Sequence, residues 1–182
     1  MVYVFIANGA EEIEALTPVD FLRRSGIEVI TVGVGGRTIT GAHNIDIGCD
    51  IEENDIELDD ILEAVILPGG MPGTLNLENS AAVNRAVDYC VEKGKLICAI
   101  CAAPSVLGHK GMLEGKEACC FPGFESELRG AKISDRFVCR DGQYITAKGM
   151  GSALSFSHAI VCALRDKKIA DKVRDSLQVS VD

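Results

Sequence analysis

Short apolar runs alternate with amphipathic stretches along most of the chain. The apolar runs are rich in β-branched residues and have the length typical of buried strands. They are VYVFIA (2–7), EVITVGV (28–34), EAVILPGG (63–70) and KLICAI (95–100). Helices are expected after the polar turn NGAEE through Arg24, with Gly26 as the C-cap, and over 80–94, 102–113 and most of 151–177. This alternation predicts a doubly wound α/β domain with a mostly parallel sheet covered by helices on both faces.

Two further segments depart from this alternation. Residues 36–60 are expected to form short strands and loops, because NIDIGCD (44–50) alternates as a half-exposed strand does. The segment FVCRDGQYITAKG (137–149) predicts a β-hairpin with Asp141 and Gly142 as its turn signal. No internal repeat or linker interrupts the 182 residues, so we expect a single domain covering 1–182.

The balance of charge narrows the classes of partner. A net charge of −9 argues against nucleic acid and against anionic membranes, because each would require a concentrated basic patch. Small molecules or other proteins are therefore the expected partners. Met1 leads directly into VYVFIA, with no charged leader and no long apolar span, so a cytoplasmic protein is expected.

The eight cysteines are expected to be reduced thiols, because a chain of this length buries a core without a disulfide scaffold. Cys90 recurs with Val83, Val87 and Val91 on one helix face, which predicts that it packs in the core as a small apolar side chain.

Cys98 and Cys101 have the spacing of a redox dithiol or of half a zinc site. Because Cys98 belongs to a strand and Cys101 follows its end, extended backbone would separate their Cα atoms by roughly 10 Å, too far for a disulfide. A zinc site is not expected either. No second ligand pair has a comparable spacing, and the adjacent Cys119 and Cys120 would point to opposite faces of a strand.

Cys101 stands instead between a strand and a helix, followed by the small residues Ala102 and Ala103. A nucleophile held at such a turn is exposed at the carboxyl edge of the sheet, and the N-terminus of the next helix favours thiolate over thiol. The alternative is a buried thiol at the end of a strand, without a chemical role. The pattern alone leaves both interpretations open.

Four blocks of sequence carry a resemblance to a known family. They are GAEEIEALTPVDFLRRSGIEV (9–29), VILPGGMPG (65–73), AICAAPSVLG (99–108) and TAKGMGSALSFSHAIV (146–161). In this order and spacing, the chain resembles the ThiJ/PfpI superfamily, within the branch of the parkinsonism-associated deglycase and the bacterial YajL-type proteins. The resemblance covers nearly the whole chain and implies a flavodoxin-like topology and a homodimer.

The resemblance also implies a site. The family's nucleophile falls on Cys101, and the glutamate that hydrogen-bonds its sulfur falls on Glu14. Backbone N–H groups of an oxyanion pocket fall on Gly70 and Ala102. The residues expected to line the site are His43, Phe121, Gly149 and Gly151. Without the resemblance, Glu14 would equally be part of an ordinary acidic helix start with its two acidic neighbours.

The chain departs from the family where relatives carry a histidine. The deglycase branch has histidine at the position of Phe121, where YajL-type proteins resemble this chain, and PfpI-type proteases have histidine at the position of Ala102. Peptide hydrolysis is therefore not expected, because the departing amine would lack its general acid.

The three histidines of the chain offer no replacement. His109 would lie roughly 12 Å along the helix from Cys101, and His158 is expected to be a satisfied, partly buried side chain. His43 aligns loosely with a basic position that, in the family, reaches toward the site of the neighbouring subunit.

Two chemistries are open to a Cys101–Glu14 pair. The first is glyoxalase or deglycase chemistry without a cofactor or metal, in which the sulfur adds to a 2-oxoaldehyde such as methylglyoxal and Glu14 relays the proton. The second is a redox sensor or chaperone that works by oxidation of Cys101. The family label also suggests a role in thiamine thiazole synthesis. The sequence does not support that role, because it contains no P-loop, no GxGxxG motif and no basic cluster.

Overall fold

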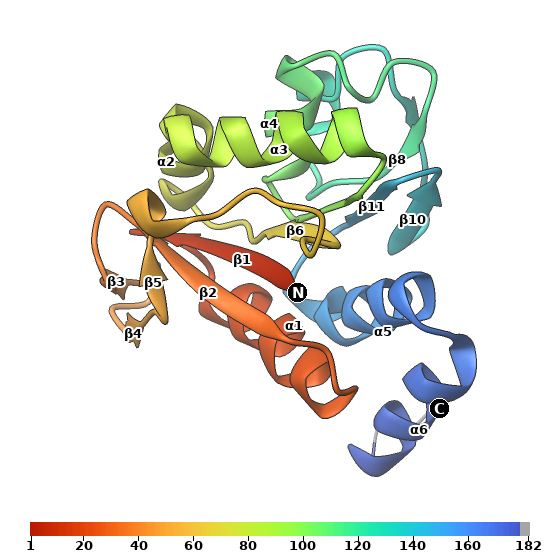
Figure 1. The fold of residues 1–182 in the computed structure, drawn as a ribbon. Helices are drawn as coiled ribbons and strands as arrows, with labels where there is room; N and C mark the ends of the chain where they lie inside the picture. The colour runs from red at the N-terminus through yellow and green to blue at the C-terminus, as the bar shows by residue number, and fades with distance from the viewer. Residues whose placement is uncertain (179–182) are drawn as a thin grey trace.

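The computed structural model of the protein describes residues 1–178, and a seven-stranded sheet runs through its centre (Figure 1). The strands lie in the order β10-β11-β7-β6-β1-β2-β5. Their bounds are β1 Val2–Ala7, β2 Val29–Val34, β5 Ile51–Glu52, β6 Ala64–Leu67, β7 Leu96–Ile100, β10 Val138–Asp141 and β11 Tyr144–Ala147. Neighbouring strands are parallel except β10 and β11. Numbered along the chain, the five inner parallel strands have the flavodoxin-like order 2-1-3-4-5, so the predicted fold is confirmed.

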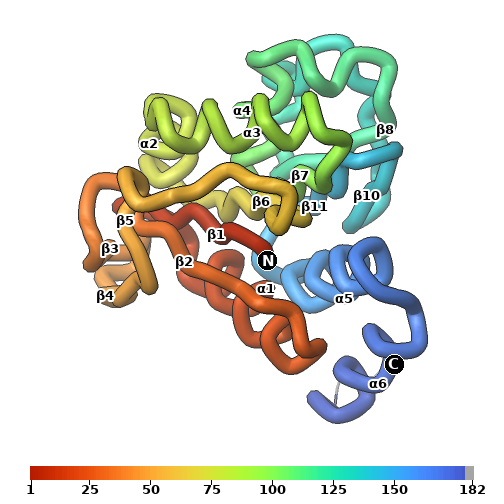
Figure 2. The backbone as a smooth tube through the Cα atoms, viewed as in Figure 1, coloured from red at the N-terminus to blue at the C-terminus, as the bar shows by residue number. Residues whose placement is uncertain are grey.

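Helices cover both faces of the sheet, as the backbone trace in Figure 2 also shows. On one face lie α1 (Glu12–Arg24) and α5 (Ala153–Leu164), with α6 (Lys167–Ser176) packed against α5. On the other face lie α2 (Gly73–Asn79), α3 (Ala81–Lys93) and α4 (Pro104–His109). No helix within residues 1–178 is long and apolar enough to cross a bilayer.

The inner strands are apolar at consecutive positions because both of their faces are buried. In β1, Val2, Val4 and Ile6 pack against the side of α1 and α5, whereas Tyr3 and Phe5 pack against the side of α3. Cys90 is fully buried on the α3 side, as predicted.

Several short elements complete the fold. The strands β3 (Thr38–Thr40) and β4 (Asp46–Gly48) form a separate antiparallel hairpin, and β8 (Glu117–Ala118) pairs with β9 (Lys132–Ile133) in parallel. The described part of the chain also contains three single 3₁₀ turns, η1 (Glu53–Asp55), η2 (Glu125–Glu127) and η3 (Met150–Ser152).

Some predicted boundaries were wrong. The helix after Cys101 is much shorter than 102–113, because the chain turns at Lys110 and enters the left-handed region at Gly111 with φ +69. The helix α2 has no counterpart in the prediction. Ser25 is the cap of α1, and Gly26 follows it in the left-handed conformation.

The predicted hairpin 137–149 is present, but it belongs to the main sheet. Its strand β11 pairs with β7, and the hairpin's two loop residues are Gly142 and Gln143 rather than Asp141 and Gly142. Cys119 and Cys120 follow β8 instead of lying within a strand.

Candidate active site

Four chain connections meet at the carboxyl edge of the parallel strands. Glu14 lies in α1 after β1, Gly69 and Gly70 follow β6, Cys101 follows β7, and Gly149 follows β11. In an open α/β sheet, this edge and the reversal of strand order between β1 and β6 are where ligands bind. The topology therefore brings together residues that are far apart in the sequence.

Cys101 occupies a strained backbone turn. Its φ of +65 lies in the left-handed region, which residues with a Cβ rarely adopt. The strain is held by hydrogen bonds on both sides, since Cys101 N donates to Ala147 O at 2.9 Å and Phe121 N donates to Cys101 O at 2.8 Å. A cysteine presented in this way has the geometry of a nucleophile elbow.

Glu14 is buried beside this thiol, with only 1% of its surface exposed. Its carboxylate accepts a hydrogen bond from Gly69 N at 3.0 Å and another from the backbone of Met150, and it also hydrogen-bonds the Cys101 side chain. A carboxyl group without a cationic partner is costly to bury unless such donors compensate it.

The three acidic residues at the start of α1 have separate roles. The Glu11 carboxylate is the helix N-cap and accepts from Glu14 N at 2.7 Å. Glu12 faces the loop that carries His43. Only Glu14 reaches the thiol, so an ordinary acidic helix start describes Glu11 better than it describes Glu14.

Burial raises the pKa of Glu14 to about 7. Burial, together with the nearby Glu14 carboxylate, raises the pKa of Cys101 to about 12, and the backbone N–H groups of Gly70 and Ala102 oppose that rise. In the free protein, these shifts favour the thiol over the expected thiolate. The helix α4 has six residues and no side-chain cap, too short a helix to offset the burial of the sulfur.

Two glycines shape the floor of the site. A Cβ on Gly69 would lie 2.5 Å from the Cys101 Cβ and 2.7 Å from Glu14 Oε2, so a larger residue at this position would push the two side chains apart. Gly70 adopts φ +90, which turns its N–H toward the Cys101 sulfur. The backbone N–H groups of Gly70 and Ala102 thus both lie beside the Cys101 sulfur.

An apolar cavity of about 390 Å³ adjoins this pair. It is lined by Phe121, Pro122, Phe137, Lys148, Gly149, Met150, Gly151 and Ser152. Three of the four predicted lining residues, Phe121, Gly149 and Gly151, therefore lie together. A Cβ on Gly149 would lie 3.3 Å from the Phe121 ring and 3.7 Å from Glu14 Oε1, so this wall of the cavity is also close to the Glu14 carboxyl group.

His43 does not join this cavity. Its side chain is 68% exposed, and its Nδ1 lies 2.8 Å from Glu12 Oε2. Glu11, Glu12 and His43 place one potential ligand atom each within 4.8 Å of one another, but both Glu12 oxygens already accept from His43 and Glu11 caps α1.

The other histidines and Cys98 lie away from the thiol. His109, at the end of α4, contacts Glu78 and Glu127, and His158 contacts Asp171 on α6, so both have polar partners. Cys98 is fully buried within β7, which confirms its core position, and all eight cysteines are free.

Sequence reasoning missed two residues of the site, Gly69 and Met150. Gly69 is the first glycine of LPGG, and two consecutive glycines after a buried strand could have indicated that both are packed against other backbone. Met150 contributes a backbone N–H, which no side-chain pattern reports.

Known proteins match this chain over nearly its whole length. Protein dj-1beta of Drosophila melanogaster is 33% identical over 180 residues, which cover 97% of this chain and 96% of that protein. The structure of oxidised Toxoplasma gondii DJ-1 superposes with a TM-score of 0.91 at 31% identity and covers 98% of each chain.

Two other relatives mark the range of similarity. The chain is 34% identical over 179 residues to protein DJ-1 homolog B of Arabidopsis thaliana. The match covers 97% of this chain but only 41% of that longer protein. A deglycase of Pyrococcus abyssi is 26% identical over 166 residues, which cover 90% of this chain and 99% of that protein. Residues 1–163 match the DJ-1/PfpI family as a whole. The chain belongs to the DJ-1/PfpI family, and the relatives that match it over nearly their full length include DJ-1 proteins.

Proposed function

We propose that the protein is a cofactor-independent glyoxalase or deglycase that acts on 2-oxoaldehydes such as methylglyoxal, or on their early adducts with thiols and amines. The observation that carries the proposal is the buried Cys101–Glu14 pair, with the N–H groups of Gly70 and Ala102 directed at the sulfur. The name of the Pyrococcus relative, a deglycase, supports the same class of activity.

The first step uses the protonation state of the pair. At neutral pH, Glu14 accepts the thiol proton as the sulfur attacks, and its pKa of about 7 suits a general base at that pH. A bond forms between Cys101 Sγ and the aldehyde carbon of the substrate. The aldehyde oxygen then takes the proton from Glu14 and becomes the hydroxyl of a hemithioacetal, which leaves Glu14 ionised again. The N–H groups of Gly70 and Ala102 stabilise the oxygen while it carries negative charge.

The second step moves a proton between neighbouring carbons. Glu14 removes the hydrogen from the former aldehyde carbon and returns it to the former ketone carbon, while the hydroxyl proton of the hemithioacetal passes to the former ketone oxygen. The product is a lactyl thioester. Water then cleaves the thioester, and lactate leaves while the thiol is restored. The aldehyde carbon is oxidised and the ketone carbon is reduced by the same two electrons, so no cofactor is needed.

The raised pKa of the Cys101 thiol weighs against a redox sensor as the main function. Oxidation to sulfenic acid proceeds through the thiolate, and burial beside Glu14 disfavours that form in the free protein. Base-assisted attack on a substrate does not require a standing thiolate. The raised pKa therefore suits turnover better than oxidation through a standing thiolate.

The test measures lactate formed from methylglyoxal by freshly reduced protein, beside Cys101→Ser and Glu14→Gln. We expect both variants to lose at least about 100-fold in rate. The control is Cys98→Ala, which changes the buried cysteine three residues before Cys101 and should retain activity. Absence of turnover in the reduced wild type, with ready addition of oxygen at Cys101 in peroxide, would replace this proposal by the redox sensor.

A homodimer belongs to the same proposal. Four large apolar side chains are 40% to 55% exposed near the N-terminal ends of α1 and α5, two helices that pack against each other: Ile13, Leu16, Met150 and Leu154. An apolar surface of this kind next to the candidate site suits a second copy of the chain. Light scattering after size exclusion should give a dimer for the wild type and for the control Ile61→Asp, and a monomer for Leu154→Asp.

A further inference from the structure

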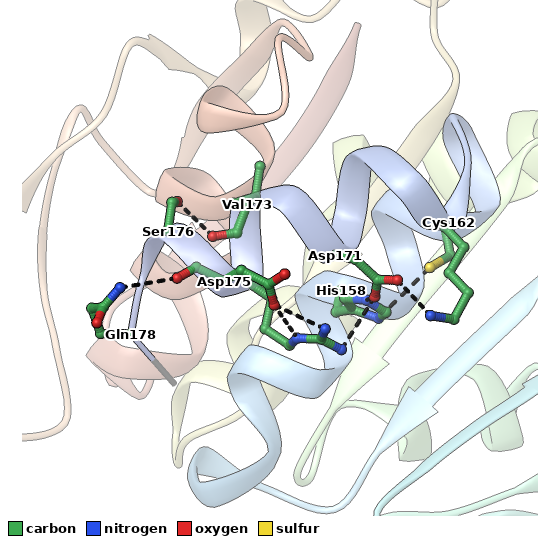
Figure 3. A network of polar contacts seen from close by, with 9 residues as sticks. His158, Cys162, Asp171, Val173, Asp175, Ser176 and Gln178 are labelled. Carbon is green, nitrogen blue, oxygen red and sulfur yellow. Dashed lines mark hydrogen bonds and ion pairs between the residues drawn. The ribbon is translucent and has the colours of Figure 1, made fainter. Parts of the chain in front are cut away.

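A second cysteine has a histidine and an aspartate beside it, on α5 and α6 (Figure 3). Cys162 Sγ lies 3.6 Å from His158 Nδ1, and His158 Nε2 lies 2.9 Å from Asp171 Oδ1. Cys162 and His158 are four residues apart on α5 and are therefore neighbours on its surface, while Asp171 comes from α6. The imidazole is thus held between a thiol and a carboxylate, near the end of α5 that is remote from Cys101.

The carboxylate fixes the tautomer of the imidazole. Hydrogen bonds from Lys167 and His158 lower the pKa of Asp171 to about 2, and Arg174 contributes a further ion pair at 3.1 Å. An ionised carboxylate only accepts hydrogen bonds, so in the neutral imidazole of His158 Nε2 carries the hydrogen and Nδ1 presents its lone pair to Cys162. The thiol of Cys162 is then the donor in the contact with Nδ1.

The thiol itself needs a base in order to react. Burial raises the pKa of Cys162, Asp171 and Asp166 raise it further, and Lys167 and Arg140 act in the opposite direction. Cys162 is therefore a thiol at neutral pH. It is half-buried, and it contacts His158 Nδ1, which can take its proton. The His158 ring also lines a cavity of about 140 Å³, so the imidazole is reachable from solvent.

We propose that Cys162, His158 and Asp171 form a second reactive site, at which α,β-unsaturated carbonyl compounds add covalently to Cys162. His158 Nδ1 takes the proton from the thiol while the sulfur bonds to the β-carbon of the acceptor. The double-bond electrons move to the α-carbon and its carbonyl, and the imidazolium returns the proton to the α-carbon. One S–C bond and one C–H bond form, nothing leaves, and no oxidant is needed.

The class of electrophile follows from this single-proton relay. A Michael acceptor requires removal of one proton from the thiol and delivery of one proton to the adduct, and a neutral imidazole held by a carboxylate performs both transfers. Asp171 makes no contact with the electrophile. It is a positioning residue that keeps His158 in the active tautomer.

The test uses N-ethylmaleimide, an α,β-unsaturated carbonyl compound, with the full chain at pH 7 and peptide mass spectrometry that follows each cysteine separately. The adduct at Cys162 should form at least about tenfold faster in the wild type than in His158→Gln. The difference should narrow toward pH 10, where hydroxide removes the thiol proton directly. Asp171→Asn should also slow the adduct, because an amide can donate to Nε2 and so shift the hydrogen to Nδ1.

The exposed Lys168 on α6 supplies the matched control, and Lys168→Gln should label at the wild-type rate. Circular dichroism establishes that each variant is folded; if His158→Gln is not, Asp171→Asn decides the question. Equal labelling of Cys162 at pH 7 in the wild type and the folded variants would overturn the proposal, as would the absence of any adduct at Cys162 in the folded wild type.

Discussion

Glu14 and Cys101 share a hydrogen bond beside Gly69, in a site where burial raises the pKa of both side chains. Because the pKa of Glu14 is about 7 and that of Cys101 about 12, the pair holds two protons below a pH of about 7 and one proton above it. In the one-proton state, the thiol carries the proton and the carboxylate can receive it. This state is the one that base-assisted attack requires.

The rate of lactate formation should therefore rise with pH through about 7. Because the base is mostly protonated at pH 6 and mostly ionised at pH 8, we expect kcat/KM to increase roughly tenfold between these values. The measurement is a pH series corrected for uncatalysed loss of methylglyoxal, and iodoacetamide labelling of Cys101 should follow the same curve. A rate that is constant or that falls over this range would show that Glu14 is not the base.

Because burial raises the pKa of Glu14, ionisation of this side chain destabilises the folded protein. The unfolded chain releases the Glu14 proton near pH 4.5, whereas the folded protein keeps it until about pH 7, so stability falls as the pH rises between these values. Glu14→Gln lacks this titration. Its unfolding free energy relative to that of the wild type should increase by an amount on the order of 1–3 kcal/mol from pH 5 to pH 8. Melting temperatures of the two proteins at the two pH values measure this change. A difference that is independent of pH would contradict the assigned protonation state.

Gly69→Ala tests the geometry of the pair without changing its chemistry. The added Cβ would come within 2.5 Å of the Cys101 Cβ and 2.7 Å of Glu14 Oε2, so one of the two groups must move. We expect a loss of about 100-fold in kcat/KM, because a displacement of about 1 Å is enough for such an effect. Gly48→Ala in β4 is the matched control, since nothing lies within 4 Å of a Cβ at that position either, and it should retain most of the activity.

The convergence of this site could be predicted, because the pattern of strands and helices determines which loops share an edge. The runs that became β1, β6 and β7 are apolar and continuous, and their parallel pairing brings Glu14, Gly70 and Cys101 to one edge. The positions of these residues follow from topology and from the family resemblance together.

The protonation of the pair and the lengths of the short elements could not be predicted. The pKa of Cys101 depends on its burial and on a carboxylate from another strand connection, neither of which is visible in the motif AICAAPSVLG. Likewise, α4 ends at His109 because of a left-handed turn at Gly111, and the two-residue strands β8 and β9 contain too few positions for a hydrophobic period to be detected.

His109, at the end of α4, links this helix to α2 and η2 and should stabilise the fold in a pH-dependent way. Its Nδ1 contacts Glu78 in α2, and its Nε2 lies 2.8 Å from Glu127 in η2. Hydrogen bonds with Glu127 and Glu78 raise the pKa of His109, and the bond with His109 lowers the pKa of Glu127.

The sign of the effect follows from these two shifts. The stability from His109 is fully present below the ordinary histidine pKa of about 6.5 and is lost as the pH rises through the higher folded value, whereas the Glu127 contribution is lost in acid. His109→Gln should therefore lower the melting temperature more at pH 6 than at pH 9. His43→Gln changes a histidine that is 68% exposed and should have a much smaller effect at both values. If the loss from His109→Gln were larger at pH 9, the two contacts would have to stabilise the neutral imidazole rather than the cation.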